Sequence, residues 1–143
     1  MVWHRTTQNA RIRILVVDDH EVVRRHLCRV IQSQPDMEVV SEAGDGKHAI
    51  ESASELHPDV ILLDIGLPGL DGFTTARHIR SVAPTSEILF VSQHDTTQMV
   101  REALRAGARG YVVKVDALNE LVPAVHAVSE KKQYISARLA DHL

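Results

Sequence analysis

Cysteine is nearly absent from this 143-residue chain, and positive charge is not in excess. The single cysteine, Cys28, cannot form an internal disulfide, which argues against a small secreted scaffold and favours a reducing compartment. The 16 Lys and Arg side chains are outnumbered by 19 Asp and Glu side chains, so the formal net charge is -3. A protein that binds nucleic acid without regard to base sequence would carry an excess of basic over acidic side chains.

Long apolar segments are also missing. The longest apolar runs are only a few residues, far short of the roughly 20 needed to cross a bilayer. The polar N-terminus up to Arg13 has no apolar centre of a secretory signal. We therefore expect a cytoplasmic protein without membrane attachment, in which residues 1–11 form a loose leader. With 44% apolar residues and no repeat or linker, the rest is typical of one folded domain.

Two common kinds of ligand site have no counterpart in the sequence. The segment Gly44-Asp45-Gly46 is too short for a phosphate-binding glycine loop, and no Walker lysine is present, so we expect no bound nucleotide. None of the nine histidines belongs to the i, i+4 pair with an acidic partner that binds zinc on a helix. We interpret them as scattered surface groups, except His26, which we place partly buried on the core side of its helix.

Five short apolar runs, each followed by polar or turn residues, predict β-strands. They are Ile12 to Val17, Met37 to Ala43, Val60 to Leu63, Ile88 to Val91, and Tyr111 to Val113. Four of them are almost continuously apolar, as parallel strands covered on both faces should be. The second run includes Glu38, Ser41 and Glu42, which favours a position at the edge of the sheet.

Segments with a helical period follow each of the five runs. Their apolar stripes span Val22 to Ile31, Ala49 to Leu56, Phe73 to Ala83, Met99 to Leu104, and Leu118 to Val128. Five strand–helix repeats with right-handed crossovers predict an α/β, flavodoxin-like (βα)5 fold with a doubly wound parallel sheet. The usual strand order, 2-1-3-4-5, makes the first and third strands neighbours, so the loops at their carboxyl ends share one crevice.

Three carboxylates lie at the ends of these two neighbouring strands. Asp18 and Asp19 follow the first strand, and Asp64 follows the third. Carboxylates this close would repel by about 4 kcal/mol per pair at an effective dielectric constant near 20, so the cluster requires a cation. Oxygen ligands that leave room for water and a phosphoryl group suit Mg²⁺. One Asp alone would be better explained as a cap of the next helix, but three together favour a metal site.

Polar side chains also end the fourth and fifth strands. Ser92 follows the fourth and Lys114 the fifth. A lysine can neutralise one phosphoryl oxygen and a serine hydroxyl can hydrogen-bond another, while an Asp carboxylate is a competent phosphoryl acceptor. Either residue alone would be interpreted as a solvated charge or a turn residue. Their joint placement with the carboxylates favours phosphoryl chemistry.

Four strings resemble the receiver domain of two-component response regulators, over roughly Ile12 to Val128. They are LVVDDH at Leu15–His20, LDIGLPGLDG at Leu63–Gly72, FVS at Phe90–Ser92 and GYVVK at Gly110–Lys114. The resemblance implies that Asp64 accepts phosphate from a sensor histidine kinase in a reaction that needs Mg²⁺ or Mn²⁺. It further implies that the phosphate is lost by slow hydrolysis and that the domain acts in signalling rather than as an enzyme.

The same resemblance implies a role for each residue of the site. The metal ligands would be Asp19 and Asp64 directly, Asp18 through water, and Gly66 through its backbone carbonyl. Ser92 and Lys114 would bind the phosphoryl oxygens. Tyr111 would be the aromatic switch that turns inward when Ser92 moves.

Within the family, the match is closest to the NarL/FixJ-type subfamily, through Asp18–His20, Ser92–Asp95 and Gln133–Ser136. Its members usually continue into a helix-turn-helix domain, so the resemblance implies transcription regulation, with DNA bound only through an output domain not present in this chain. We interpret residues 12–130 as the receiver domain and residues 131–143 as a tail or the start of a linker helix. An excised receiver and a natural single-domain regulator both remain open.

Two positions depart from the family pattern. Val115 follows Lys114 where many receivers have proline, which predicts a looser turn. Gln93 follows Ser92 where a small residue is common, and we expect its bulk to shield the phosphoryl group from water.

Two other functions and one assembly stay open as alternatives. A Mg²⁺-dependent phosphohydrolase with an Asp nucleophile would place its two catalytic carboxylates two residues apart, whereas Asp18 and Asp19 are adjacent. A pseudo-receiver that only binds partners would have lost acidic, hydroxyl or lysine positions, and all of these are filled. The apolar stripes of the first and last helices could pair two copies about a twofold axis, although core packing is the default explanation for them.

Overall fold

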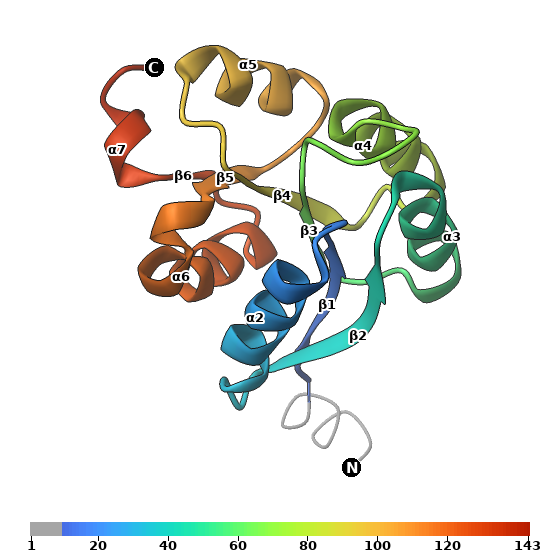
Figure 1. Cartoon of the computed structure of the whole chain (residues 1–143). Coiled ribbons are helices and arrows are strands. Elements are labelled where there is room, and N and C mark those ends of the chain that lie inside the picture. The colour runs from blue at the N-terminus through green and yellow to red at the C-terminus, as the bar shows by residue number, and fades with distance from the viewer. Residues whose placement is uncertain (1–9) are drawn as a thin grey trace.

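The computed structural model describes residues 10–143, which form a parallel β-sheet covered by helices on both faces (Figure 1). The strands are β1 (Ile12–Val17), β2 (Met37–Ala43), β3 (Val60–Leu63), β4 (Glu87–Ser92), β5 (Gly110–Val113) and β6 (Tyr134–Ile135). Their order is β2-β1-β3-β4-β5-β6, with every pair parallel. The predicted order is therefore confirmed, and the structure adds a sixth strand at the edge beside β5.

The helices are α2 (Glu21–Gln32), α3 (Gly46–Leu56), α4 (Gly72–Val82), α5 (Thr97–Arg105), α6 (Ala117–Ser129) and α7 (Ala137–Ala140). A 3-10 turn, η1 (Lys114–Asp116), joins β5 to α6. Helices α2 and α6 cover one face of the sheet, and α3, α4 and α5 cover the other (Figure 1). Within these residues, no helix is both long enough and apolar enough to span a membrane.

The strands are nearly all apolar because each contributes side chains to two separate cores. In β1, Leu15 and Val17 pack with the helices α3, α4 and α5, whereas Ile14 and Val16 pack with α2 and α6. Successive side chains of a strand point to opposite faces, so a strand covered on both sides needs apolar residues at consecutive positions. This packing holds the carboxyl ends of the central strands in fixed register.

Side-chain caps fix the starts of three helices. Asp45 accepts a hydrogen bond from the backbone N–H of His48, Asp71 from that of Thr74, and Thr96 from that of Met99. In α2, the buried residues are Leu27, Cys28 and Ile31. His26 is exposed, so its expected partly buried position is wrong: the buried stripe of α2 is narrower than the apolar pattern of the sequence suggested.

The C-terminal segment packs against the sheet. Tyr134 and Ile135 pair with Gly110 and Tyr111 of β5, and Leu139 of α7 is buried in the core on the α5 side. This segment is the one interpreted from the sequence as a tail or the start of a linker helix. Most of the predicted leader, residues 1–9, lies outside the described residues.

Candidate functional site

The first and third strands deliver two buried carboxylates to one end of the sheet. Val17 of β1 pairs with Leu63 of β3, and the next residues along these strands are Asp18 and Asp64. The backbone N–H of Asp64 donates to the carbonyl of Val17 over 3.2 Å, which ties the two strand ends together. Asp18 is 0% exposed and Asp64 is 6% exposed. Their closeness is therefore imposed by strand pairing, as the sequence predicted.

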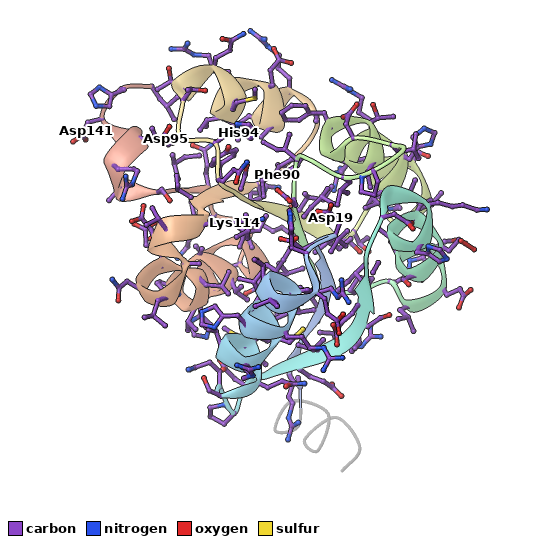
Figure 2. The ribbon with its side chains drawn as sticks, viewed as in Figure 1. Asp19, Phe90, His94, Asp95, Lys114 and Asp141 are labelled. Atoms are coloured by element: carbon purple, nitrogen blue, oxygen red, sulfur yellow. The ribbon has the colours of Figure 1, made fainter. Side chains whose placement is uncertain are left out.

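Asp19 and His20 complete an acidic cluster with these two carboxylates. One oxygen or nitrogen atom from each of Asp18, Asp19, His20 and Asp64 can be chosen so that all four atoms lie within 4.8 Å of one another. Asp19 is at the same end of the sheet as Lys114 (Figure 2). Unlike its two acidic neighbours, Asp19 is exposed, so the cluster opens to solvent on its side.

Lys114 supplies the positive charge that faces the cluster. Its Nζ lies 2.8 Å from Asp18 Oδ2 and 3.2 Å from Asp64 Oδ2. Burial by itself would lower the pKa of Lys114, but the Asp18 and Asp64 carboxylates outweigh that effect and raise the pKa above the ordinary lysine value. The ammonium group is therefore held in its charged form between the two buried carboxylates.

The cluster keeps free acceptor capacity for a cation. Only the contact of Lys114 with Asp64 has the alignment of a hydrogen bond, so within residues 10–143 the buried Oδ2 of Asp18 has an ion-pair neighbour but no aligned donor. The other oxygens are partly used, because Asp18 Oδ1 accepts from the N–H of His20 and Asp64 Oδ1 from that of Ile65. The one ammonium faces two carboxylates, and Asp19 adds a third to the cluster. This excess of negative charge, with an oxygen left without an aligned donor, suits a hard divalent cation such as Mg²⁺.

The loop after Asp64 is shaped by close backbone packing. Gly72 donates its N–H to the carbonyl of Ile65 over 2.7 Å. A Cβ atom on Gly72 would collide with the carbonyl oxygen of Asp64, so glycine is required there. Gly66, the expected backbone ligand, is exposed in this loop and has open space around its Cα. Its role as a ligand through the backbone carbonyl stays a prediction.

Ser92 and Tyr111 are both connected to the loop between β4 and α5. Ser92 ends β4 with its side chain buried, and its Oγ accepts a hydrogen bond from the N–H of His94. The hydroxyl of Tyr111 donates to the carbonyl of His94 over 2.8 Å. The Tyr111 ring is fully buried, 6.4 Å from the ring of Phe90, and burial raises the pKa of its hydroxyl. Tyr111 is therefore already buried in this structure, and its role as a switch stays a prediction.

The turn after Lys114 differs from the sequence expectation. Without a proline it was expected to be loose, yet Lys114–Asp116 forms a regular 3-10 turn closed by the N–H of Ala117 on the carbonyl of Lys114. The carboxylate of Asp116 is also held by Arg138 of α7 through two hydrogen bonds of 2.7 and 2.8 Å. The C-terminal segment is thus attached to this turn by side-chain hydrogen bonds.

Sequence analysis missed two sets of contacts near the site. His20 was predicted to be a scattered surface group, because it forms no helical i, i+4 pair with another histidine; its position directly after Asp18-Asp19 was the available signal. The contacts of Arg138 with Asp116, and of Ser136 with Glu120, link residues far apart in the sequence. No local pattern reveals pairs of that kind.

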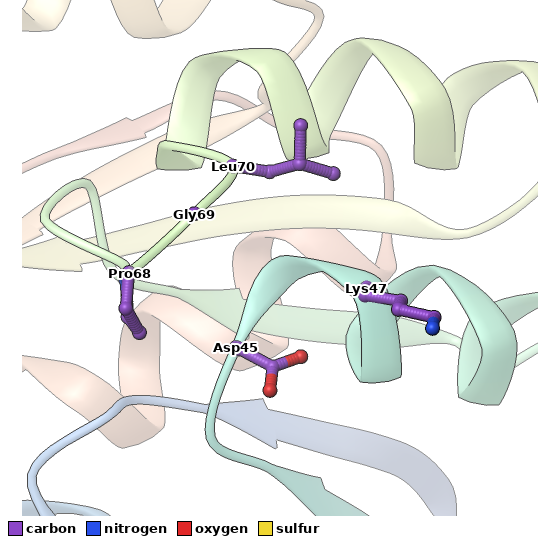
Figure 3. Close-up of a pocket in the computed structure, with 5 residues that line it drawn as sticks. All are labelled: Asp45, Lys47, Pro68, Gly69 and Leu70. Atoms are coloured by element: carbon purple, nitrogen blue, oxygen red, sulfur yellow. The ribbon is translucent and has the colours of Figure 1, made fainter.

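An open hollow of about 580 Å³ lies beside the site but is distinct from it (Figure 3). It is bordered by the loop after β2 and the loop after β3, and its lining residues are Asp45, Lys47, Pro68, Gly69 and Leu70. Asp45 already caps α3 and holds His48. The lining residues do not include any of the buried charged groups described above, so the chemistry belongs to the acidic cluster.

A model of the response regulator receiver domain matches residues 14–126 of this chain. The chain belongs to this family. The expected receiver fold and signalling function are confirmed, and because a receiver domain is a signalling domain rather than a classical enzyme, the phosphohydrolase alternative is not supported.

Known receiver domains and response regulators cover most of this chain. It is 35% identical over 132 residues to the response regulator GacA of Pseudomonas viridiflava, a match that covers 92% of this chain and 62% of that protein. It is 33% identical over 133 residues to the transcriptional regulatory protein DegU of Brevibacillus brevis, covering 93% of this chain and 56% of that protein. The receiver domain thus spans little more than half the length of these curated relatives.

Solved structures give the same assignment. A two-component response regulator of the LuxR family from Aurantimonas sp. has a TM-score of 0.88 and 36% identity, covering 92% of this chain and 94% of that one. The signal receiver domain of the putative response regulator NarL from Mycobacterium tuberculosis has a TM-score of 0.82 and 35% identity, covering 86% of this chain and 99% of that one.

Proposed function

We propose that this receiver domain accepts a phosphoryl group on Asp64 from a phosphohistidine of a sensor histidine kinase. The observation that carries the proposal is the position of the buried Asp64 carboxylate, 3.2 Å from the Lys114 ammonium and next to Asp18 and Asp19. This arrangement places a nucleophile, a positive charge and a cation-binding cluster around one point. Each is a recurring part of phosphoryl-transfer sites.

The transfer exchanges one bond to phosphorus for another. A carboxylate oxygen of Asp64 forms a bond to phosphorus, the bond between phosphorus and the kinase imidazole nitrogen breaks, and that nitrogen keeps the electron pair. Lys114, already charged and held at this point, neutralises negative charge on a phosphoryl oxygen. In the later hydrolysis, a water oxygen bonds to phosphorus and the bond to Asp64 breaks, which restores the carboxylate and releases phosphate.

The acidic cluster would hold the metal that this chemistry needs. Asp19 and Asp64 would bind Mg²⁺ or Mn²⁺ directly, Asp18 through water, and Gly66 through its carbonyl. When bound, the metal neutralises charge on the phosphoryl oxygens during transfer. The support for this part is the buried Asp18 oxygen that has no aligned donor within the described residues.

Ser92 and Tyr111 provide a route from the new charge to α5. Phosphorylation replaces the single negative charge of the Asp64 carboxylate by a phosphoryl group that carries roughly 1.5 to 2 negative charges, which favours a Ser92 hydroxyl that donates to a phosphoryl oxygen. A movement of the Ser92 hydroxyl toward the phosphoryl group on Asp64 would break the hydrogen bond that Ser92 now accepts from the N–H of His94. Because Tyr111 holds the carbonyl of the same His94, the loop before α5 and the ring of Tyr111 would shift together. The output would be a changed affinity for partners.

Besides the kinase, two further partners are proposed: DNA through an output domain, and a second copy of this chain. DegU, a relative about twice as long as the matched region, is named a transcriptional regulatory protein, which supports DNA binding through an output domain rather than through this domain.

Self-association through α2 and α6 is supported by an exposed apolar side chain on each helix: Val22 of α2 is 83% exposed and Leu118 of α6 is 70% exposed. In the same stripe of α6, Leu121, Val125 and Val128 are core residues, and Val122 is partly buried against them. The cytoplasmic location stays a prediction.

The test is phosphorylation by a small donor. The protein is incubated with Mg²⁺ and acetyl phosphate, and its intact mass is measured. We expect one added phosphate on the wild type and none on Asp64→Asn. Asp36→Asn, which changes an exposed carboxylate paired with His126, is the matched control and should be labelled like the wild type. Labelling of all three would place the acceptor elsewhere, and labelling of none would favour the pseudo-receiver.

A further inference from the structure

His20 is a metal-binding type of residue that the proposed function leaves unused, and it lies against the acidic cluster. Its Nδ1 is 3.3 Å from Asp19 Oδ1 and 3.4 Å from Asp18 Oδ1. Together with an oxygen of Asp64, these atoms belong to the set that lies within 4.8 Å. The imidazole nitrogen is therefore as close to the carboxylate oxygens as two ligands of one ion would be.

The distances fit shared coordination. With metal–ligand bonds of about 2.1 Å, adjacent ligands of an octahedral ion lie about 3 Å apart. The 3.3 Å separation of His20 Nδ1 from Asp19 Oδ1, the proposed direct ligand among its two neighbours, is only a few tenths of an ångström longer, so a cation could be bound with small side-chain rotations. The His20 side chain is 68% exposed, so nothing has to be unpacked for such a rotation.

The backbone at His20 is fixed from both sides. Its N–H donates to Asp18 Oδ1 over 2.9 Å, and its carbonyl accepts from the N–H of Arg24 in the first turn of α2 over 2.9 Å. The position of the Cα and Cβ atoms is thus set by Asp18 of the cluster and by the first turn of α2. A second observation points to a cation in the cluster: Asp18 is completely buried, and its Oδ2, 2.8 Å from Lys114 Nζ, has no aligned donor within residues 10–143.

We propose that His20 Nδ1 is a direct ligand of the bound metal and that it shifts the preference of the site from Mg²⁺ toward Mn²⁺ and related transition-metal ions. Mg²⁺ prefers oxygen ligands and retains its waters. Imidazole nitrogen suits first-row transition metals, whose affinity for such sites rises along the series. This inference rests on the proposed function, since it adds a fourth side chain to the same metal site.

The direct test uses Mn²⁺ as a paramagnetic probe on the full chain. Pulsed electron paramagnetic resonance of the Mn²⁺-loaded protein should show coupling to a ligating ¹⁴N nucleus, replaced by ¹⁵N coupling when the protein contains ¹⁵N-labelled histidine. His20→Ala should lose this coupling while still binding Mn²⁺. The matched control is His48→Ala, because His48 Nδ1 also contacts a carboxylate, that of Asp45 at 2.8 Å, on α3. It should keep the coupling.

Affinities provide the second readout. We expect His20→Ala to weaken Mn²⁺ binding about tenfold, the lower end of the usual loss when a group around a metal is removed, and to change Mg²⁺ binding by less than about twofold. Equal losses for both ions would show that His20 acts only through charge or local structure and would overturn the proposal.

The remaining outcomes separate this inference from the proposed function. Bound Mn²⁺ without histidine coupling in the wild type would overturn the role of His20 and leave phosphorylation of Asp64 untouched. A wild type that binds no Mn²⁺ or Mg²⁺ would overturn both.

Discussion

The guanidinium of Arg138 in α7 binds the carboxylate of Asp116 through two parallel hydrogen bonds, of 2.7 Å from Nε and 2.8 Å from Nη2. The hydrogen bonding from Arg138 is the largest cause that holds the pKa of Asp116 below its ordinary value, and the positive charge of Arg138 adds to it. Asp116 is the last residue of η1, and Lys114 is the first. The C-terminal segment is therefore attached to the same short turn that carries Lys114.

Removing this contact should loosen the C-terminal segment. In Arg138→Ala, we expect the amide protons of residues 139 and 140 to exchange about threefold faster, because a two-hydrogen-bond contact at the surface is lost. Hydrogen–deuterium exchange measured by mass spectrometry would detect the change. Arg105→Ala, which removes the exposed contact of Arg105 with Glu102 on α5, is the control. Unchanged exchange in Arg138→Ala would mean that Leu139 packing alone holds α7.

Ser136 makes the buried part of the same attachment. Its Oγ donates to Glu120 Oε1 over 2.6 Å and accepts from the N–H of Val113 over 2.8 Å, and the residue is fully buried. Ser136→Ala would leave the Val113 N–H without its acceptor, which should lower the free energy of unfolding by about 1 to 3 kcal/mol. Urea unfolding would measure the loss. Ser81→Ala removes an exposed hydroxyl that bonds only the carbonyl of His78, and it should have little effect.

Glu87 should make the stability of the domain depend on acid pH. Burial alone would raise the pKa of this carboxyl, but hydrogen bonds from Arg109 and Lys131 outweigh burial and hold the pKa below its ordinary value of 4.5. The stabilisation is therefore complete above that ordinary value and is lost as the pH falls through the lower pKa of the folded state. Urea unfolding of the wild type should show a loss of stability below about pH 4.5.

The matched variants isolate the contribution of this carboxylate. Glu87→Gln should be less stable than the wild type at pH 7, and its stability should fall less on acidification. The exposed Glu55→Gln should behave like the wild type at both pH values. If Glu87→Gln and the wild type lost stability in parallel over the acid range, other carboxylates would be responsible.

Gly72 should be needed to keep Asp64 in place. A methyl group there would meet the carbonyl of Asp64 and lie 2.6 Å from the Cα of Ile65, both rigid backbone groups. We expect Gly72→Ala to lose about 1 to 3 kcal/mol of stability, as overpacking typically costs, together with slower labelling by acetyl phosphate. Gly44→Ala meets only a side-chain atom of Arg24 at 3.7 Å, an ordinary contact, and is the stability control. Equal stabilities of the two variants would show that the loop can shift.

The strand order and the positions of Asp18, Asp64 and Lys114 could be predicted because they depend on local patterns. Buried parallel strands require continuous apolar runs, and the residue after each run must then lie at the carboxyl edge of the sheet. Strand β6 could not be predicted in this way, because Tyr134–Ile135 is only 2 residues long. It exists because β5 offers an unpaired edge, and because Ser136 and Arg138 hold the segment from the other side.

The histidines show a different limit. His26 was placed on the core side because it falls on an apolar stripe, yet that stripe is wider than the surface that the sheet and α6 can cover. His20 was assigned to the surface, and it is indeed mostly exposed. Exposure alone did not reveal that the turn into α2 brings its ring to two carboxylates. Both positions depend on how the elements pack in three dimensions, which the helical periodicity of the sequence does not specify.

Gln93 should lengthen the lifetime of the phosphorylated state. It directly follows Ser92, and the residue is exposed. If its bulk keeps the attacking water from phosphorus, Gln93→Ala should dephosphorylate faster, since exclusion of water is one way in which a site slows hydrolysis. The measurement is loss of the added phosphate with time after acetyl phosphate is removed. Gln98→Ala, an exposed position on α5, should decay like the wild type, and an unchanged lifetime in Gln93→Ala would rule out shielding.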